Sequence, residues 1–426
     1  MEYILPKYNN RGKEILFWEN ISRYICNGMK RSTIHIALLA ILFFTACQTL
    51  DSYSYGEGWG YHFSRASWEP THSLPVLEIN TADGKMISSK TDWKDASFTL
   101  GDTVMKGKVK GRGNSTWAYP KKPYSIKLSE ADTLLGMPSS TRWNLLANYL
   151  DPTLMRNAVT FEMARLTSLD WTPQGRYVEV IINGIFMGNY YLTEKVEIGL
   201  GRINVGSSGN LVCFDDYYDE PYRFKTSRRK LPVNILPASG TSLDQEHFQQ
   251  IRTLYDTAEA VIYGGGYWQD ILDVESFCDW YLLQEISTNT EARWPKSVYM
   301  HTGADGKIHA GPAWDYDYSA YRKGVGKLVA KEDLWYDALL KDPAFTAVLK
   351  ERWALLRPRA EEVVPGFIDS TAEVIGDSAR MDREMWPVSL HINGDEQMGF
   401  DEATERLKET ILDRLVAMDV LIARLP

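Results

Sequence analysis

Two aspartates, Asp315 and Asp317, stand two residues apart in the segment GPAWDYDYS, which begins at Gly311. The residues before it alternate like two strands joined by a turn at residues 304–306. A strand that continues through both aspartates places their carboxylates on one face, because side chains alternate with a period of two. Two carboxylates held so close repel each other unless a cation lies between them, and Mg²⁺ bound with a phosphate-bearing substrate is the usual solution. A solvated loop after a buried strand is the alternative interpretation.

A second polar segment, GRGNSTWAYPKKPYSIKL over residues 111–128, has the composition of a phosphate-binding loop. Its glycines let backbone N–H groups approach a phosphate closely, and Arg112 can hold the anion with its planar guanidinium. Asn114 and Ser115 add short polar side chains. Lys127 lies on the strand expected next, where we predict that it points into a cleft as a phosphate ligand. A polar hairpin turn with one surface lysine explains the same residues without any function.

Asn289 and Glu291 follow an expected helix, some two dozen residues before Asp315. An amide and a carboxylate just ahead of a metal-binding aspartate are a common arrangement for phosphoryl transfer. The carboxylate acts as the base, while the amide oxygen and the aspartate hold magnesium. Taken alone, such a polar triplet is equally typical of a helix C-cap and turn.

The elements that must position these residues divide into strands followed by helices. Strand-like runs occupy residues 75–81, 97–100, 103–113 and 123–128. A helix is predicted over 152–167 with Asp151 as its N-cap, and the neighbouring Arg156 is expected to pair with a carboxylate inside the fold. A hairpin that turns at Asn183-Gly184 follows.

Beyond about residue 200 the pattern favours helices, including one that begins near Asp273 and a final amphipathic helix over 401–425. Strands first and helices afterwards predict an α+β fold in two lobes. We place a strand-rich N-lobe at residues 74–196 and a helical C-lobe at residues 197–426.

The amino-terminal part of the chain has the pattern of an export signal. A basic start at residues 29–31 precedes an apolar run over 34–45 that ends before Cys47. This predicts a lipoprotein signal peptide at 29–46, a lipid anchor on Cys47 and a tether over 47–73. We interpret residues 1–28 as the result of a misassigned start codon. An uncleaved membrane helix is the alternative, and both place the body in the cell envelope, outside the cytoplasmic membrane.

Composition limits the partners and the metals that we expect. A formal net charge of −9 over 426 residues argues against nucleic acid as a partner. No pair of cysteines or histidines has the spacing of a zinc site, so none is expected. Apart from Cys26 and Cys47, only Cys213 and Cys278 remain, and a disulfide between them cannot be assumed.

Several of these segments together resemble the CotH kinase family, over most of residues 75–426. The family's motifs occur in order: RGNSTW at 112–117, KKPYSIK at 121–127, NYLD with RN at 148–157, the hairpin ending in Glu194, and WDYD at 314–317. The resemblance implies an atypical protein-kinase-like fold with two lobes. It also implies binding of ATP with Mg²⁺ or Mn²⁺ and transfer of the γ-phosphate to Ser or Thr of an exported protein, whose identity the sequence leaves unknown.

By position in the family pattern, Asp315 looks like the magnesium ligand, supported by Asn289 and Asp317. Lys127 would steady the phosphates together with the loop residues Arg112, Asn114 and Ser115, and Glu194 would contact adenine at the hinge.

The chain also departs from the family pattern at the residue expected to act as the general base. Glu291 stands where the family has aspartate, and Ser297 where a second asparagine is expected. The additional methylene displaces the carboxylate by about 1 Å, which can cost on the order of a hundredfold in rate. A catalytically weak or inactive envelope scaffold is therefore the alternative function. A glycoside hydrolase is disfavoured, because two carboxylates on one strand face cannot flank a sugar.

Overall fold

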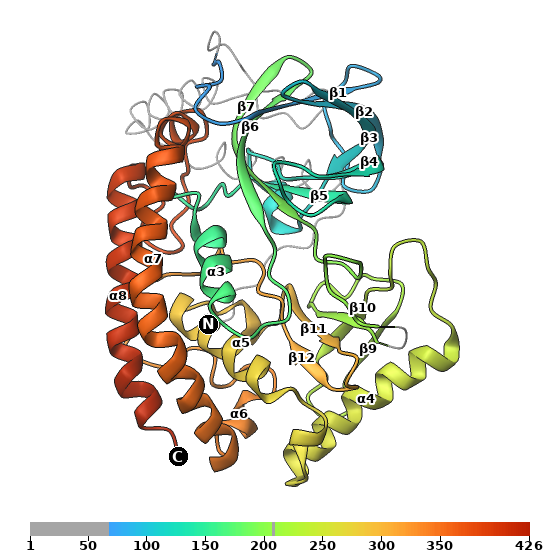
Figure 1. Ribbon diagram of the computed structural model, residues 1–426, viewed down its shortest axis with the longest axis vertical. Helices are drawn as coiled ribbons and strands as arrows, with labels where there is room; N and C mark the ends of the chain where they lie inside the picture. Colours follow the sequence, from blue (N-terminus) through green and yellow to red (C-terminus); the bar gives the residue numbers. More distant parts are fainter. Residues whose placement is uncertain (1–67, 207–208) are drawn as a thin grey trace, which may run out of the picture. The chain divides into compact units, whose positions relative to one another are not determined.

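The computed structural model of the protein describes residues 68–206 and 209–426 (Figure 1). Contacts group the chain from Trp68 to Pro426 into one compact unit. The predicted misassigned start, the signal peptide and the lipid anchor on Cys47 lie outside the described residues, and the tether is described only from residue 68. In the part of the chain that is described, no helix is both long enough and apolar enough to span a bilayer.

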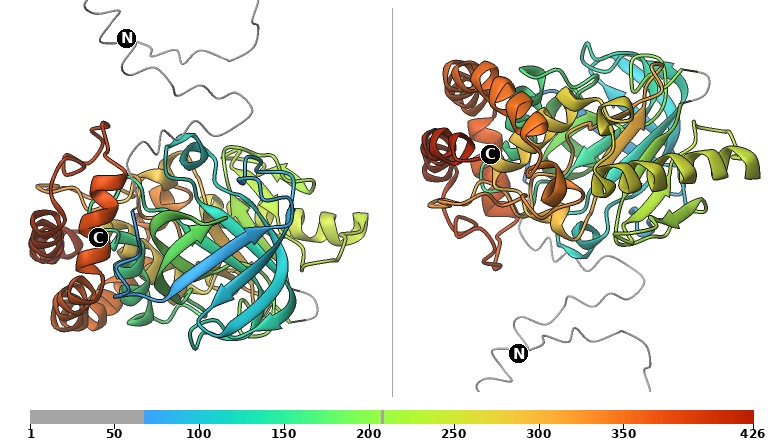
Figure 2. Two further views of the ribbon diagram at one scale, coloured as in Figure 1. Left: turned by 90° about the horizontal axis from the view of Figure 1, so that it is seen from above. Right: turned by 90° about the horizontal axis from the view of Figure 1, so that it is seen from below.

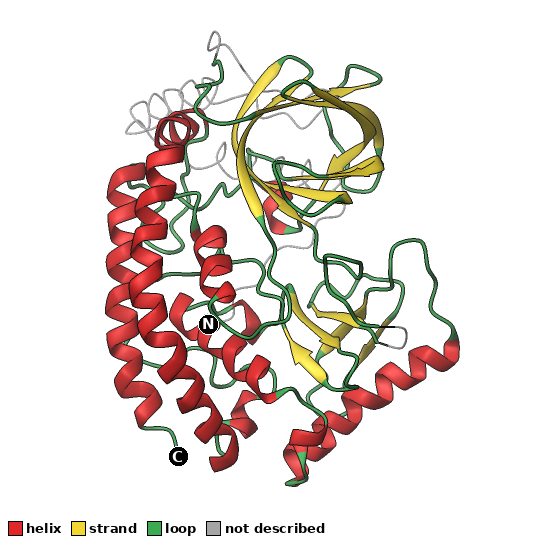
Figure 3. Ribbon diagram, in the orientation of Figure 1, coloured by secondary structure: helices red, strands yellow, loops and turns green. Residues whose placement is uncertain are grey.

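Seven strands of the amino-terminal half form a closed barrel in the order β1-β2-β3-β4-β5-β7-β6 (Figures 1 and 3). Antiparallel pairs make up most of the barrel, and parallel pairing of β1 with β6 closes it. Alternate residues such as Ile79, Val109 and Ile126 are buried and fill its interior. The strands are β1 (Val76–Thr81), β2 (Lys94–Leu100), β3 (Thr103–Gly111), β4 (Tyr124–Asp132), β5 (Ser140–Leu146), β6 (Gly175–Ile182) and β7 (Ile185–Glu194).

The carboxyl-terminal half contains a second sheet as well as most of the helices. Its five strands run in the order β12-β11-β8-β10-β9. They are β8 (Leu211–Phe214), β9 (Arg223–Lys225), β10 (Pro232–Ile235), β11 (Val298–Thr302) and β12 (Ile308–Ala310). The α-helices are α3 (Arg156–Arg165), α4 (Gln245–Gly264), α5 (Val274–Ser287), α6 (Tyr336–Leu339), α7 (Pro343–Met385) and α8 (Phe400–Ala423). Short 3₁₀ helices are η1 (Ser115–Ala118), η2 (Trp268–Asp270) and η3 (Glu291–Arg293).

Helix α5 is the centre of the helical part. It is buried along most of its length and contacts α3, α7, α8 and β12. The long helices α7 and α8 pack side by side, as both views in Figure 2 show. Helix α3 precedes β6 in the sequence but packs against α5 and α7, so the strand-rich half contributes one helix to the helical part.

Several expected elements are confirmed. Asp273 caps α5 by accepting a hydrogen bond from the N–H of Ser276 at 2.9 Å. The β6–β7 hairpin turns at Asn183 and Gly184, whose φ angles of 50° and 78° are those that a two-residue hairpin turn requires. The final helix, α8, occupies the region predicted for it. The mixed α+β composition, with a strand-rich first part and a helical second part, is also confirmed.

Three features differ from the expectation. The strands of the first half close into a barrel, and the second half contains a sheet that was not predicted, because each of its five strands has only three to five residues. The helix expected over 152–167 begins only at Arg156. Positive φ angles at Asn148 and Leu154 turn the chain before it, and Met155 occupies the N-cap position predicted for Asp151. The lobe boundary at residues 196 and 197 stays a prediction.

Candidate functional site

A cavity of about 770 Å³ lies between the barrel and the second sheet. Barrel residues that line it include Lys110 on β3, Ser125 on β4 and Arg142 on β5. The opposite wall includes Asp215, which follows β8, and Tyr299 on β11. The cavity is large enough for a ligand of nucleotide size.

Seven acidic residues line the cavity, and they include Asp215, Glu291, Asp315 and Asp317; the others are Glu197, Asp219 and Glu220. Burial raises the pKa of Glu291 to about 9; the negative charges of Asp315 and Asp317 add to this shift, and Lys296 opposes it. Burial also raises the pKa of Asp317, to about 7, with Asp315 as the next contributor. Burial raises the pKa of Asp215 as well. These groups resist ionising together, and a divalent cation among them would relieve the repulsion.

The loop that carries Asp315 and Asp317 is not the continued strand that the sequence pattern predicted. Strand β12 ends at Ala310, and Asp315 has a φ of 73°, a left-handed conformation that aspartate tolerates. Asn157 on α3 accepts a hydrogen bond from the N–H of Tyr316 at 2.8 Å. Both carboxylates reach the same cavity, but a turn held by α3 brings them there rather than strand alternation.

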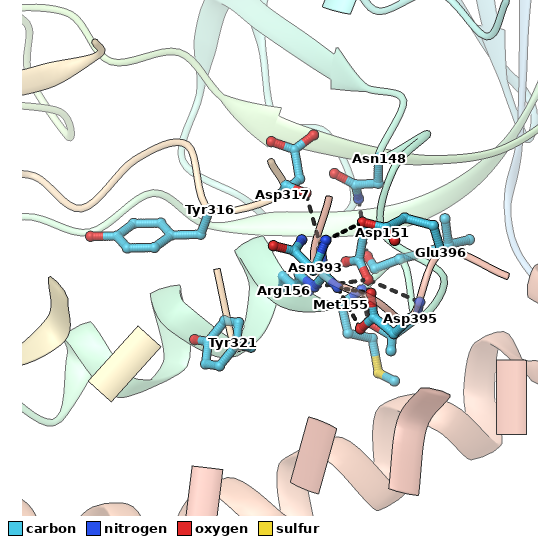
Figure 4. A network of polar contacts seen from close by, with 12 residues as sticks. Asn148, Asp151, Met155, Arg156, Tyr316, Asp317, Tyr321, Asn393, Asp395 and Glu396 are labelled. Carbon is cyan, nitrogen blue, oxygen red and sulfur yellow. Dashed lines mark hydrogen bonds and ion pairs between the residues drawn. The ribbon is translucent and has the colours of Figure 1, made fainter. Parts of the chain in front are cut away.

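A buried polar network supports this loop from below (Figure 4). Arg156 is fully buried, and its Nη1 donates to the backbone oxygen of Asp317 at 3.2 Å. Its Nη2 donates to both carboxylate oxygens of Asp395, each at 2.6 Å, and its Nε lies 3.6 Å from Oδ1 of Asp151. Asp151 in turn accepts a hydrogen bond from the backbone N–H of Arg156 at 2.8 Å. Three distant parts of the chain therefore meet beneath Asp317.

The predicted phosphate-binding loop lies on the cavity wall. Arg112, Asn114 and Ser115 all line the cavity, and the guanidinium of Arg112 lies 5.5 Å from the ring centroid of Trp314. Burial lowers the pKa of Arg112, and the carboxylate of Asp315 counteracts this shift. Gly113 has a φ of 81°, and a Cβ at this position would collide with the side chain of Thr116. The loop therefore requires glycine there.

Lys127 does not point into the cleft as predicted. It is exposed on β4, between the buried residues Ile126 and Leu128 that point into the barrel. The described residues that line the cavity do not include Lys127, whereas Lys110 and Arg142 on the adjacent strands do line it. Lys127 shares the outer face of β4 with Ser125, which does line the cavity, so its place two residues further along the strand, and not the face it occupies, separates it from the wall.

Glu194 and Asn289 lie beside the cavity rather than on it, as far as the described lining residues show. Glu194 is fully buried at the end of β7, where it forms an ion pair with Arg202 and accepts the N–H of Gln174 at 2.8 Å. Its side chain is thereby engaged, and the residues that follow it, 195–197, line the cavity instead. Asn289 accepts a hydrogen bond from the N–H of Glu291 at 3.0 Å and thus positions the start of η3.

Sequence reasoning missed part of the cavity wall. Asp215 accepts hydrogen bonds from the N–H groups of Tyr217 and Ser297 at 2.9 and 3.1 Å, which joins the β8 loop to the segment after η3. A carboxylate directly after a short buried strand was the available signal. An apolar patch of the wall was also missed, and it comprises Leu146, Val196, Leu211 and Leu236. Cys213 and Cys278 are both buried and free.

A family model described as CotH kinase protein matches residues 109–418. The match spans the loop of Arg112, the network around Arg156 and all the acidic residues that line the cavity. A search of curated proteins found no match.

Proposed function

The chain belongs to the CotH kinase protein family, and on this premise we propose that it transfers the γ-phosphate of ATP to Ser or Thr side chains of exported or envelope proteins. The family makes the protein kinase-like. The acceptor, the use of ATP with Mg²⁺ or Mn²⁺, and the place of action belong to the proposal. One observation carries it: Glu291, Asp315 and Asp317 share a cavity with Arg112.

The donor set fits a divalent cation and a phosphate chain. Asp315 and Asp317 offer carboxylate oxygens, which Mg²⁺ prefers, and their mutual repulsion favours a bound cation. When bound, the metal would neutralise charge on the phosphates. Arg112 and Lys110 supply cationic groups for the phosphate oxygens, and the apolar patch around Val196 and Leu211 supplies a surface for a flat base.

Glu291 is the residue that we assign to accept the proton of the attacking hydroxyl. The oxygen–phosphorus bond to the acceptor forms while the bond between the γ-phosphorus and the bridging oxygen breaks, so ADP leaves. With a pKa near 9, Glu291 holds a proton at neutral pH as long as no cation offsets its neighbours. Glu291 can therefore act as a general base only when a positive charge lies beside Asp315 and Asp317.

The remaining parts of the proposal concern the lobes and the location. The barrel would serve as the N-lobe of a two-lobed kinase-like fold and the helical part as the C-lobe, with the boundary near residue 196. A lipid on Cys47 would hold the protein at a membrane of the cell envelope, outside the cytoplasm. The signal-like segment over 29–46 supports this location.

The test is labelling by γ-³²P-ATP with Mg²⁺ or Mn²⁺, using the full chain in detergent and a Ser/Thr-rich envelope protein as acceptor. Asp315→Asn should reduce labelling by roughly 10²-fold or more, as loss of a group that stabilises charge in the transition state does. Asp102→Asn, in the exposed β2–β3 turn, is the matched control and should label like the wild type. Equal labelling by both variants would refute the mechanism.

A catalytically weak scaffold is the second candidate. Two observations favour it: Lys127 lies outside the cavity, and Glu291 holds a proton at neutral pH in the absence of a cation. Melting curves with ATP and Mg²⁺ separate the two functions, because tight binding raises Tm by mass action. An unchanged Tm at millimolar nucleotide would favour the scaffold.

A further inference from the structure

Two histidines face each other on the β11–β12 hairpin, away from the acidic cluster described above. His301 and His309 are opposite residues in the antiparallel register, and their ring centroids are 5.2 Å apart. Asp170, from the loop between α3 and β6, reaches both of them. Its Oδ2 lies 2.8 Å from Nε2 of His301 and 2.8 Å from Nδ1 of His309. Two imidazole nitrogens and one carboxylate oxygen therefore converge on a single point.

The outer nitrogen of each ring faces an acceptor, as is usual for histidines that ligate a metal. Nε2 of His309 lies 3.1 Å from Oδ1 of Asp305, and Nδ1 of His301 lies 3.5 Å from the backbone oxygen of Gly311. The nitrogen of His309 that faces Asp170 is Nδ1. This Nδ1 is buried and has no hydrogen-bond partner within residues 68–206 and 209–426, despite its close approach to Asp170. This nitrogen therefore lies where a ligand at the point of convergence would reach it, once it has released its proton.

We propose that Asp170, His301 and His309 bind one Zn²⁺ ion. Two imidazoles and a carboxylate are ligands of the kind that zinc accepts, and a fourth position would be left for water because the side chain of Asp170 is 46% exposed. Ligand atoms about 2.0–2.2 Å from the metal lie farther apart than the present 2.8 Å contacts, so a small shift of Asp170 would admit the ion. Mg²⁺ would not compete, because it prefers oxygen ligands.

The proposal departs from the sequence-based expectation that no histidine pair has the spacing of a zinc site. The two histidines are eight positions apart, which matches no zinc motif, and only the register of the hairpin places them face to face. The site also touches the loop of the proposed active site. The oxygen of Gly311 contacts His301, and Leu169, beside Asp170, lies next to Gly311. A bound ion would fasten the α3–β6 loop to the base of the segment that carries Asp315.

A hydrogen-bonded cluster without metal is the competing interpretation. Burial alone would lower the pKa of His309, but Asp170 and Asp305 outweigh it and raise the pKa to about 9. A proton then occupies the place that we assign to zinc, and metal binding must release it.

Co²⁺ and Zn²⁺ titrations of the full, tag-free chain in detergent, after treatment with a chelator, test the proposal. We expect one Co²⁺ per chain with the intense visible bands of four- or five-coordinate cobalt, which Zn²⁺ abolishes. Asp170→Asn and His309→Gln should each weaken binding by roughly tenfold or more, and His391→Gln, which removes an exposed histidine elsewhere, should leave it unchanged.

X-ray absorption on the zinc-loaded wild-type chain makes the test independent of whether the variants fold. Two imidazoles with oxygen and no sulfur in the first shell would support the site and exclude the cysteines of the chain. The absence of cobalt bands, a sulfur ligand, or equal affinity in Asp170→Asn and His309→Gln would each overturn the proposal.

Discussion

Arg156 donates from Nη2 to both carboxylate oxygens of Asp395 at 2.6 Å, joining two residues 239 positions apart (Figure 4). Arg156 begins α3, and Asp395 lies in the connection between α7 and α8. The same guanidinium donates to the backbone oxygen of Asp317. The buried guanidinium of Arg156 therefore contacts both the connection between the two long helices and the loop that carries Asp317.

Removing one partner of this pair should destabilise the protein strongly. Asp395→Ala leaves the buried charge of Arg156 without its main partner, so we expect the free energy of unfolding to fall by roughly 3–5 kcal/mol in urea titrations. Arg380→Met, which breaks an exposed ion pair with Asp401, is the control and should cost less than about 1 kcal/mol. Similar losses in the two variants would contradict a structural role for the pair.

Glu291 should show opposite effects on stability and on transfer. Glu291→Gln removes a group whose ionised form is disfavoured by burial and by Asp315 and Asp317. We therefore expect a Tm higher by roughly 2 °C without metal, together with a loss of labelling of about 10²-fold or more. Glu291→Asp keeps the carboxylate and should retain much more activity than Glu291→Gln. A Glu291→Gln enzyme that labels at the wild-type rate would exclude Glu291 as the base.

The positions of Arg112 and Lys127 predict different effects on nucleotide binding. Arg112→Ala removes a cationic group from the cavity wall and should weaken ATP binding about tenfold or more in calorimetric titrations, since charged hydrogen bonds contribute roughly 1.5–3 kcal/mol. Lys127→Ala removes an exposed lysine from the outside of the barrel and should change the affinity less than about twofold. A larger loss of ATP affinity in Lys127→Ala than in Arg112→Ala would instead support Lys127 as the phosphate ligand that the motif predicted.

Asp333 makes stability depend on pH. Its side-chain oxygens are buried and have no hydrogen-bond partner among the described residues, and burial raises its pKa to about 7, with Glu285 adding to the shift. The folded state therefore binds a proton more tightly than the unfolded state does. The cost of the buried charge is complete above pH 7 and disappears as the pH falls towards 4.

Asp333→Asn should consequently stabilise the protein by on the order of 3 kcal/mol at pH 8 and by no more than about 1 kcal/mol at pH 4.5. Urea titrations at the two pH values measure the difference. Glu332→Gln, at an exposed neighbouring position, should show no such dependence. A gain for Asp333→Asn that is the same at both pH values would show that charge is not its cause.

Short sequence patterns correctly predicted the elements that are held together by interactions within a few residues. The capped start of α5 at Asp273 and the Asn183-Gly184 turn follow from capping and turn chemistry within a few residues. The start of α3 does not follow from such local patterns. Asp151 accepts a hydrogen bond from the N–H of Arg156, but it does so from a folded loop and not from the N-cap position. Short strands such as β9, with three residues, carry too little periodicity to be recognised alone.

The sequence by itself determined the family, the order of its motifs, and the residue types near Asp315 and Arg112. Tertiary structure decided which of those residues meet. The cavity takes Ser125 from the outer face of β4 but not Lys127 from the same face, and the register of β11 with β12 brought His301 against His309. The physical reason is the same in both cases. The face that a strand residue occupies is fixed by local geometry, but what covers that face depends on segments far away in the chain.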